Sequence, residues 1–157
     1  MKAATISDLK KELSTLSPAD LVEACLRLAK YKKENKELLT FVLFEAHDLI
    51  GYMDGAKTEI REQLQETNHQ AYLMKKTIRK VLRTTNKYIR YAGSKEVEVE
   101  LLLYFCREIH AQKIPIHRST QMINLYAQQI KKINKAVEGL HEDLQYDYLK
   151  QLAALSA

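Results

Sequence analysis

The chain has 157 residues and a mass of 18.2 kDa, enough to bury a core without a metal ion or disulfide bonds. Hydrophobic residues make up 46% and charged residues 29%, which excludes a disordered, collagenous or membrane-spanning chain. Only four Gly and two Pro are present, whereas sheet folds need many more turn residues. The composition therefore predicts a single all-helical domain over residues 1–157.

The cysteines and the chain start predict a cytoplasmic protein. Cys25 and Cys106 lie in apolar helical patterns, so we expect buried free thiols and not a disulfide framework. The first residues carry one positive charge and no apolar stretch, which argues against a signal peptide. The longest apolar run, 101–106, is far shorter than the roughly 20 residues that span a bilayer.

The first two predicted helices have clear start signals. Ile6, Leu9 and Leu13 recur at helical spacing and predict a short helix. Ser17 followed by Pro18 predicts the N-cap and first turn of the next one.

The next segment is the most apolar of the N-terminal third. We expect a break at Asn35 and then a helix over residues 38–50. Apolar residues cover more than one face of that helix, which predicts contact with neighbours on two sides. Gly51 and Gly55 flank a predicted turn.

A long helix is predicted from this turn to Gly93, with an interruption near Asn68 left open. Ser94 is the expected cap of the following helix. The pattern of that helix is ambiguous, because apolar residues alternate with glutamates as they do in a strand. We favour a helix, since no second strand-like segment exists to pair with it. The alternating apolar residues are Val97, Val99, Leu101, Leu103 and Phe105.

The C-terminal part completes an all-helical pattern. Residues 114–116 read as an extended linker, Ser119 or Thr120 as a helix cap, and Gly139 as the end of that helix. A short helix over 140–152 follows. The chain thus predicts about seven helices, paired as antiparallel hairpins in a bundle or a short superhelical, repeat-like stack.

The first 50 residues carry a resemblance. The run 9–13, Leu-Lys-Lys-Glu-Leu, is followed by Leu16-Ser17, by Leu21 and by Tyr31-Lys32 before the apolar segment. This pattern resembles a family of small all-helical bacterial proteins described only as a domain of unknown function. The resemblance implies a bacterial cytosolic protein and transfers no functional residue.

Positive charge is concentrated in one segment. No Asp or Glu lies between Thr67 and Lys95, and the rest of the chain holds 17 basic and 20 acidic residues, so this segment accounts for the net charge of +5. Its eight basic residues are Lys75, Lys76, Arg79, Lys80, Arg83, Lys87, Arg90 and Lys95. Five of them, separated by four and three residues in turn, share one helix face; they are Lys76, Lys80, Arg83, Lys87 and Arg90.

Two interpretations of this face remain open. It is an ordinary solvated surface if glutamates of neighbouring helices pair with it; the candidates are Glu59, Glu62, Glu66, Glu96, Glu98 and Glu100. It is a binding surface if it meets an acidic protein, a membrane surface or nucleic acid, whose bases Tyr72, Tyr88 and Tyr91 would stack. We expect a non-enzymatic interaction or scaffold protein with a protein partner, and nucleic-acid binding by residues 72–95 as the alternative.

An enzyme or metal protein is the third hypothesis. It rests on Glu45, His47 and Asp48, because burial of the helix over 38–50 would force at least one of them to pair or to face a groove. The pairs Glu66-x-x-His69 and Glu138-x-x-His141 resemble di-iron ligand pairs, but their expected positions face water or a helix end. Phosphate-loop, nucleophile-elbow and Cys-x-x-Cys motifs are absent. We therefore predict no catalytic residue, no metal ligand and no cofactor.

Overall fold

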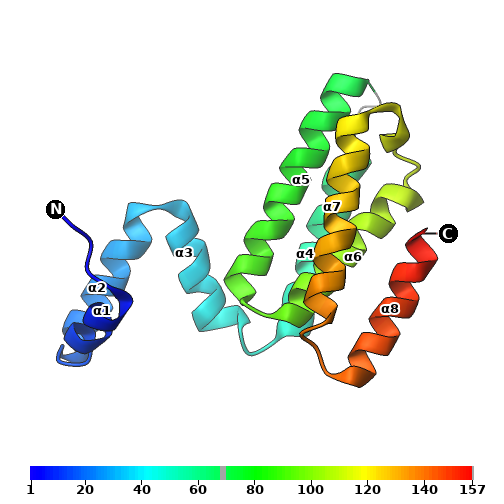
Figure 1. Cartoon of the computed structure of the whole chain (residues 1–157). Coiled ribbons are helices and arrows are strands. Elements are labelled where there is room, and N and C mark those ends of the chain that lie inside the picture. Colours follow the sequence, from blue (N-terminus) through cyan, green and yellow to red (C-terminus); the bar gives the residue numbers. More distant parts are fainter. Residues whose placement is uncertain (68–69, 157) are drawn as a thin grey trace. The chain divides into compact units, whose positions relative to one another are not determined.

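A computed structural model describes residues 1–67 and 70–156 of the chain (Figure 1). The described residues form eight α-helices, one π-helical turn, one 3-10 turn and no strand, which confirms the all-helical class with one helix more than expected. The chain divides into two compact units, Met1–Phe44 and Glu45–Ala157. The single domain over residues 1–157 stays a prediction beside this division, and each unit is described by itself.

The first unit contains α1 (Ile6–Leu13), α2 (Pro18–Tyr31) and α3 (Lys33–Thr40), and α2 packs against α3. The predicted start of α2 is confirmed, because Ser17 is its N-cap and accepts a hydrogen bond from the Asp20 amide. The break after α2 falls at Lys32, which is extended, and not at Asn35. Asn35 lies in the first turn of α3, and its Nδ2 donates to the Leu28 carbonyl over 2.8 Å. It thereby satisfies a carbonyl near the end of α2 that the helix itself cannot pair.

The predicted helix over residues 38–50 is wrong. After α3 the chain forms a π-helical turn, Phe41–Glu45, and then leaves the helical conformation before α4 (Leu49–Gln65). Burial on two sides is also wrong, since most apolar side chains of this segment are exposed, Phe44 at 66%. The expected turn between Gly51 and Gly55 lies inside α4.

Asp48 explains why α4 starts before the two glycines. Its Oδ1 accepts a hydrogen bond from the Gly51 amide at 2.9 Å, as an N-cap does. A Cβ atom at Gly51 would lie 2.4 Å from Asp48 Oδ2, so any other residue there would displace the capping carboxylate from its present position. Gly51 thus serves a helix start and not a turn.

The second unit is a bundle of α4, α5 (Ala71–Ala92), α6 (Lys95–Ala111), α7 (Thr120–Val137) and α8 (Glu142–Ser156). Consecutive helices run in opposite directions (Figure 1), which agrees with the antiparallel hairpins predicted from the sequence. The central helix is α6, which packs against each of the other four. It contributes eight buried residues: Val97, Val99, Leu101, Leu102, Leu103, Phe105, Cys106 and Ile109.

The position of α6 explains its strand-like pattern. A helix that is covered on almost every side carries apolar residues at every angle, so its sequence loses the 3.6-residue period. The predicted boundaries hold, because Gly93 is the left-handed C-cap of α5 (φ 60°) and Ser94 Oγ accepts from the Val97 amide at 3.4 Å. Asn68, where an interruption was left open, lies outside the described residues.

The two cysteines differ. Cys106 is buried as predicted, and burial raises the pKa of its thiol to about 12 against the opposing effect of a hydrogen bond with Tyr126. Cys25 is exposed, so its predicted burial is wrong. Its helix belongs to the small first unit, in which nothing covers that position.

A polar network links three helices of the second unit. Lys57 Nζ of α4 lies 2.8 Å from Glu100 Oε2 of α6, and the Tyr148 hydroxyl of α8 donates to Glu100 Oε1 over 2.9 Å. Burial alone would raise the pKa of Glu100, but hydrogen bonds and positive charge, chiefly from Lys57, lower it below its ordinary value. The ionised Glu100 therefore stabilises the fold above the unfolded-state pKa, and this contribution is lost as the pH falls through the folded-state pKa.

Lys57→Met is expected to lower the free energy of unfolding at pH 7 by about 1–3 kcal/mol, because Glu100 keeps its charge but loses its cationic partner. The loss should shrink as the pH falls through the folded-state pKa of Glu100, because the carboxylate then gains a proton. Urea denaturation at pH 7 and at a series of lower pH values, with the exposed Lys150→Met as control, measures it. An equal loss at every pH would assign the effect to packing of the lysine stem.

Candidate polyanion-binding face

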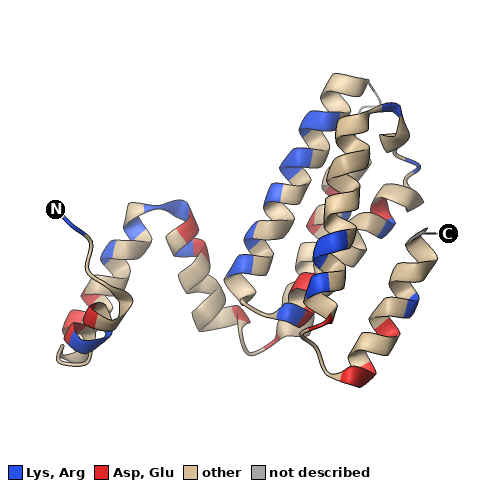
Figure 2. Cartoon of the chain, viewed as in Figure 1, with Lys and Arg blue, Asp and Glu red and all other residues tan. Residues whose placement is uncertain are grey.

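The basic residues of α5 lie opposite the core. Four residues of α5 are buried, Met74, Ile78, Val81 and Thr85. The five basic residues that share one face, Lys76, Lys80, Arg83, Lys87 and Arg90, are called the stripe. At about 100° per residue, the centre of the stripe lies about 170° around the helix axis from the centre of the four buried residues. Lys76, Lys80, Arg83 and Arg90 are exposed and Lys87 is half-buried. Figure 2 shows basic residues along the length of α5 and no acidic one.

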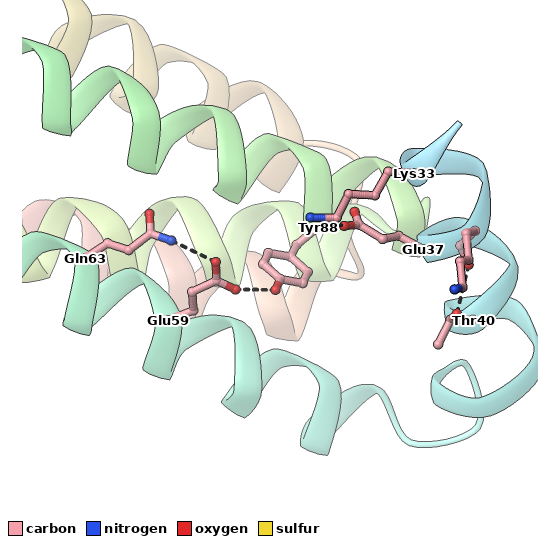
Figure 3. A network of polar contacts seen from close by, with 7 residues as sticks. Lys33, Glu37, Thr40, Glu59, Gln63 and Tyr88 are labelled. Atoms are coloured by element: carbon pink, nitrogen blue, oxygen red, sulfur yellow. Dashed lines mark hydrogen bonds and ion pairs between the residues drawn. The ribbon is translucent and has the colours of Figure 1, made fainter. Parts of the chain in front are cut away.

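Three of the six glutamates expected to pair with this face have other partners. Glu59 accepts hydrogen bonds from the Tyr88 hydroxyl and from Gln63 Nε2 (Figure 3). Glu100 is bound to Lys57, as described above, and Glu98 Oε2 lies 3.9 Å from Lys95 Nζ at the start of α6. Within the described part of the chain, four stripe residues have no carboxylate partner: Lys76, Lys80, Arg83 and Arg90.

One end of the stripe forms an open hollow of about 530 Å³. Arg79 Nη2 donates to Gln121 Oε1 of α7 over 3.2 Å, which ties the two helices together there. Tyr72, 77% exposed, presents an aromatic ring beside the cationic groups. The lining residues are Tyr72, Lys75, Lys76, Arg79, Arg83 and Gln121.

The three tyrosines proposed for base stacking are not equivalent. Tyr72 lies with the cationic residues of the hollow. Tyr88 is directed toward α4, where its hydroxyl donates to Glu59 and its ring meets Tyr52 edge-on at 5.7 Å between centroids. Tyr91 is half-buried. The structure therefore brings one of the three into the hollow.

Helix α7 extends the cationic surface, which the sequence reasoning missed. It contains Lys131, Lys132 and Lys135, all exposed, and no acidic residue. Lys132 lies about 20° from Gln121 around the axis of α7, so it shares the face that meets Arg79. The signal was present in the sequence, since 120–137 has no Asp or Glu.

The enzyme or metal site near residues 45–48 was expected only if that segment is buried, and it is not. Glu45, His47 and Asp48 are exposed, and Asp48 caps α4. No group of three side chains able to hold a metal ion occurs among the residues described. His69, one member of the ligand-like pairs, lies outside that part, and His141 Nδ1 accepts from the Asp143 amide.

Comparison with protein-family models, with curated proteins and with solved structures gave no match. The resemblance of the first 50 residues to a family of unknown function therefore stays a prediction, as does a bacterial origin. No helix in the described ranges is long and apolar enough to cross a membrane.

Proposed function

We propose that this protein is a non-enzymatic binding protein that holds single-stranded nucleic acid on the cationic face of α5. The observation that supports this proposal is the hollow, where an exposed Tyr72 ring, four cationic side chains and the Gln121 amide converge. Cations supply phosphate contacts and an aromatic ring supplies a stacking surface, which together form the usual chemistry of single-strand binding.

Electrostatics favours a long polyanion over a small ligand. From Lys76 to Arg90 the stripe extends about 21 Å along the helix, at 1.5 Å per residue. Its charges face water without carboxylate partners at Lys76, Lys80, Arg83 and Arg90. A polyanion that spans the stripe releases condensed counterions from several phosphates at once, which is the main source of non-specific affinity.

An acidic protein is the second candidate, and the sequence alone placed a protein partner first. The spacing of the stripe, alternately four and three residues, favours an acidic protein. Acidic residues on one face of a helix in such a partner would have the same spacing and could pair with the stripe. A partner of this kind needs no aromatic ring. Tyr72 therefore separates the two candidates.

The test is fluorescence anisotropy of a labelled 20-nucleotide single strand and a labelled 20-residue polyglutamate over a salt series. We expect micromolar binding of the oligonucleotide at low salt, with log affinity falling linearly against log salt. Tyr72→Ala should weaken it about 5- to 150-fold, the range of one lost base stack. The matched control is Tyr146→Ala, which removes an equally exposed tyrosine from α8.

Other results contradict the proposal in distinguishable ways. Polyglutamate binding that equals oligonucleotide binding, with no effect of Tyr72→Ala, would leave the acidic protein as the candidate. If neither probe binds at low salt, the face is only a solvated surface.

A further inference from the structure

The first unit exposes most of its apolar side chains. None of the residues of α1, α2 or α3 is buried, and of the unit's 44 residues only Phe41 is. Units of about this size are rarely stable without a disulfide, a metal or association. The large exposed apolar residues are Met1, Ile6, Leu9, Leu13, Leu16, Val22, Leu26, Leu28, Tyr31, Leu38, Val42, Leu43 and Phe44.

This unit contains both halves of a helix-in-groove contact. The apolar residues of α1 stand three and four residues apart on one face, and Ile6 is 82% exposed. Between α2 and α3 lies a groove of about 310 Å³, and no residue of α1 lines it. The groove is lined by Cys25, Leu28, Ala29, Asn35, Leu38, Leu39 and Val42.

The lining selects an apolar occupant. It contains no charged residue, and its one amide side chain, Asn35, already donates to the Leu28 carbonyl. A helix with apolar residues at intervals of three and four is the ligand that such a groove takes. With Ile6, Leu9 and Leu13, α1 is a helix of this kind.

We propose that the groove between α2 and α3 binds α1 of a second copy of this chain, so that two chains exchange α1 helices. A two-fold exchange covers both apolar surfaces of both copies at once, as an isologous interface does. The polar side of α1 carries Asp8, Lys10, Lys11 and Glu12, two charges of each sign, so two copies do not repel each other there. An eight-residue helix is also too short to persist without such packing.

Cys25 makes the exchange measurable. It is exposed and lines the groove, whereas Cys106 is buried with a raised thiol pKa and is the less reactive of the two. A Leu9→Cys variant places a second accessible thiol on the apolar side of α1. Oxidation should then give a covalent dimer on a non-reducing gel, and the Cys25→Ser substitution in this variant should abolish it. Lys11→Cys, on the opposite side of α1, is the matched control and should give little dimer.

The mass of the unmodified chain is a second, independent measurement. Light scattering after size exclusion should give twice 18.2 kDa for the full chain. Leu9→Glu with Leu13→Glu should return the mass to that of one chain, with the helical signal of circular dichroism kept except for the part due to α1. Ala3→Glu with Ala4→Glu adds the same charge outside α1 and should leave the dimer intact.

Three results would overturn the exchange. The first is a single-chain mass at 100 µM. The second, in the Leu9→Cys variant, is a disulfide between the introduced thiol and Cys25 that forms within one chain only. The third is a dimer that survives the two glutamates on α1. None of these depends on whether α5 binds nucleic acid, because the dimer is measured without a polyanion.

Discussion

Changing Lys76, Lys80 and Arg83 to Glu is expected to lower the affinity for a single-stranded oligonucleotide at 0.1 M salt about 100-fold. Each phosphate contact on a single strand contributes about 0.7 to the slope of log affinity against log salt, or about fivefold at this salt concentration. All three side chains are exposed and lack a carboxylate partner in the described structure, so their loss should not disturb the core. Anisotropy over a salt series should also show the slope reduced by about two.

The control must distinguish the loss of a binding site from the change in the net charge of the protein. Lys36, Lys113 and Lys150 are exposed and lie outside α5 and α7, and their change to Glu alters the net charge of the protein by the same amount. This control variant should keep most of the affinity. Equal weakening of both variants would mean that the oligonucleotide senses only overall charge, and the cationic face of α5 would then not be a site.

A variant of α7 defines the width of the surface. Lys132→Glu with Lys135→Glu should weaken binding about 25-fold if the strand contacts both helices, following the same contribution of each phosphate. An unchanged slope would confine the site to α5. The slope measured for this variant also shows whether the Arg79–Gln121 contact lies at the edge of the site, when only α5 binds, or within it, when both helices bind.

Much of the fold could be predicted from the sequence where a local signal has a local cause. Ser17, Gly93 and Ser94 are caps that act within four residues, and all three predictions are confirmed. The segment over 38–50 failed for a different reason. An apolar segment predicts that burial of its side chains is favourable. It does not predict that residues of the same chain bury them. Val42, Leu43 and Phe44 are apolar and are exposed all the same.

The sequence predicted part of the candidate site. The acid-free segment and the alternating intervals place the stripe opposite the core of α5, as the structure has it. The different roles of Tyr72 and Tyr88 were also accessible, because sixteen residues at about 100° separate them by about 160° around the helix. What no local pattern could reveal is the contact with α7, since Arg79 and Gln121 come together only through the packing of both helices on α6.

Phe105→Ala is expected to lower the free energy of unfolding by about 3–5 kcal/mol, because it deletes a buried aromatic ring and leaves a cavity. Phe105 is fully buried on α6, and α6 packs against every other helix of its unit. The surrounding helices must therefore all shift to fill the space, which makes partial collapse costly. The loss is comparable with the whole stability of many small domains.

Urea denaturation followed by circular dichroism measures this effect, with Glu96→Ala on the exposed side of the same helix as control. The control should change stability by less than about 0.5 kcal/mol. A loss below about 1 kcal/mol for Phe105→Ala would contradict a central α6, because a peripheral helix can move inward to close a cavity. A large loss, by contrast, means that α5 and α7 hold their positions through α6, and the cationic surface then depends on that core for its shape.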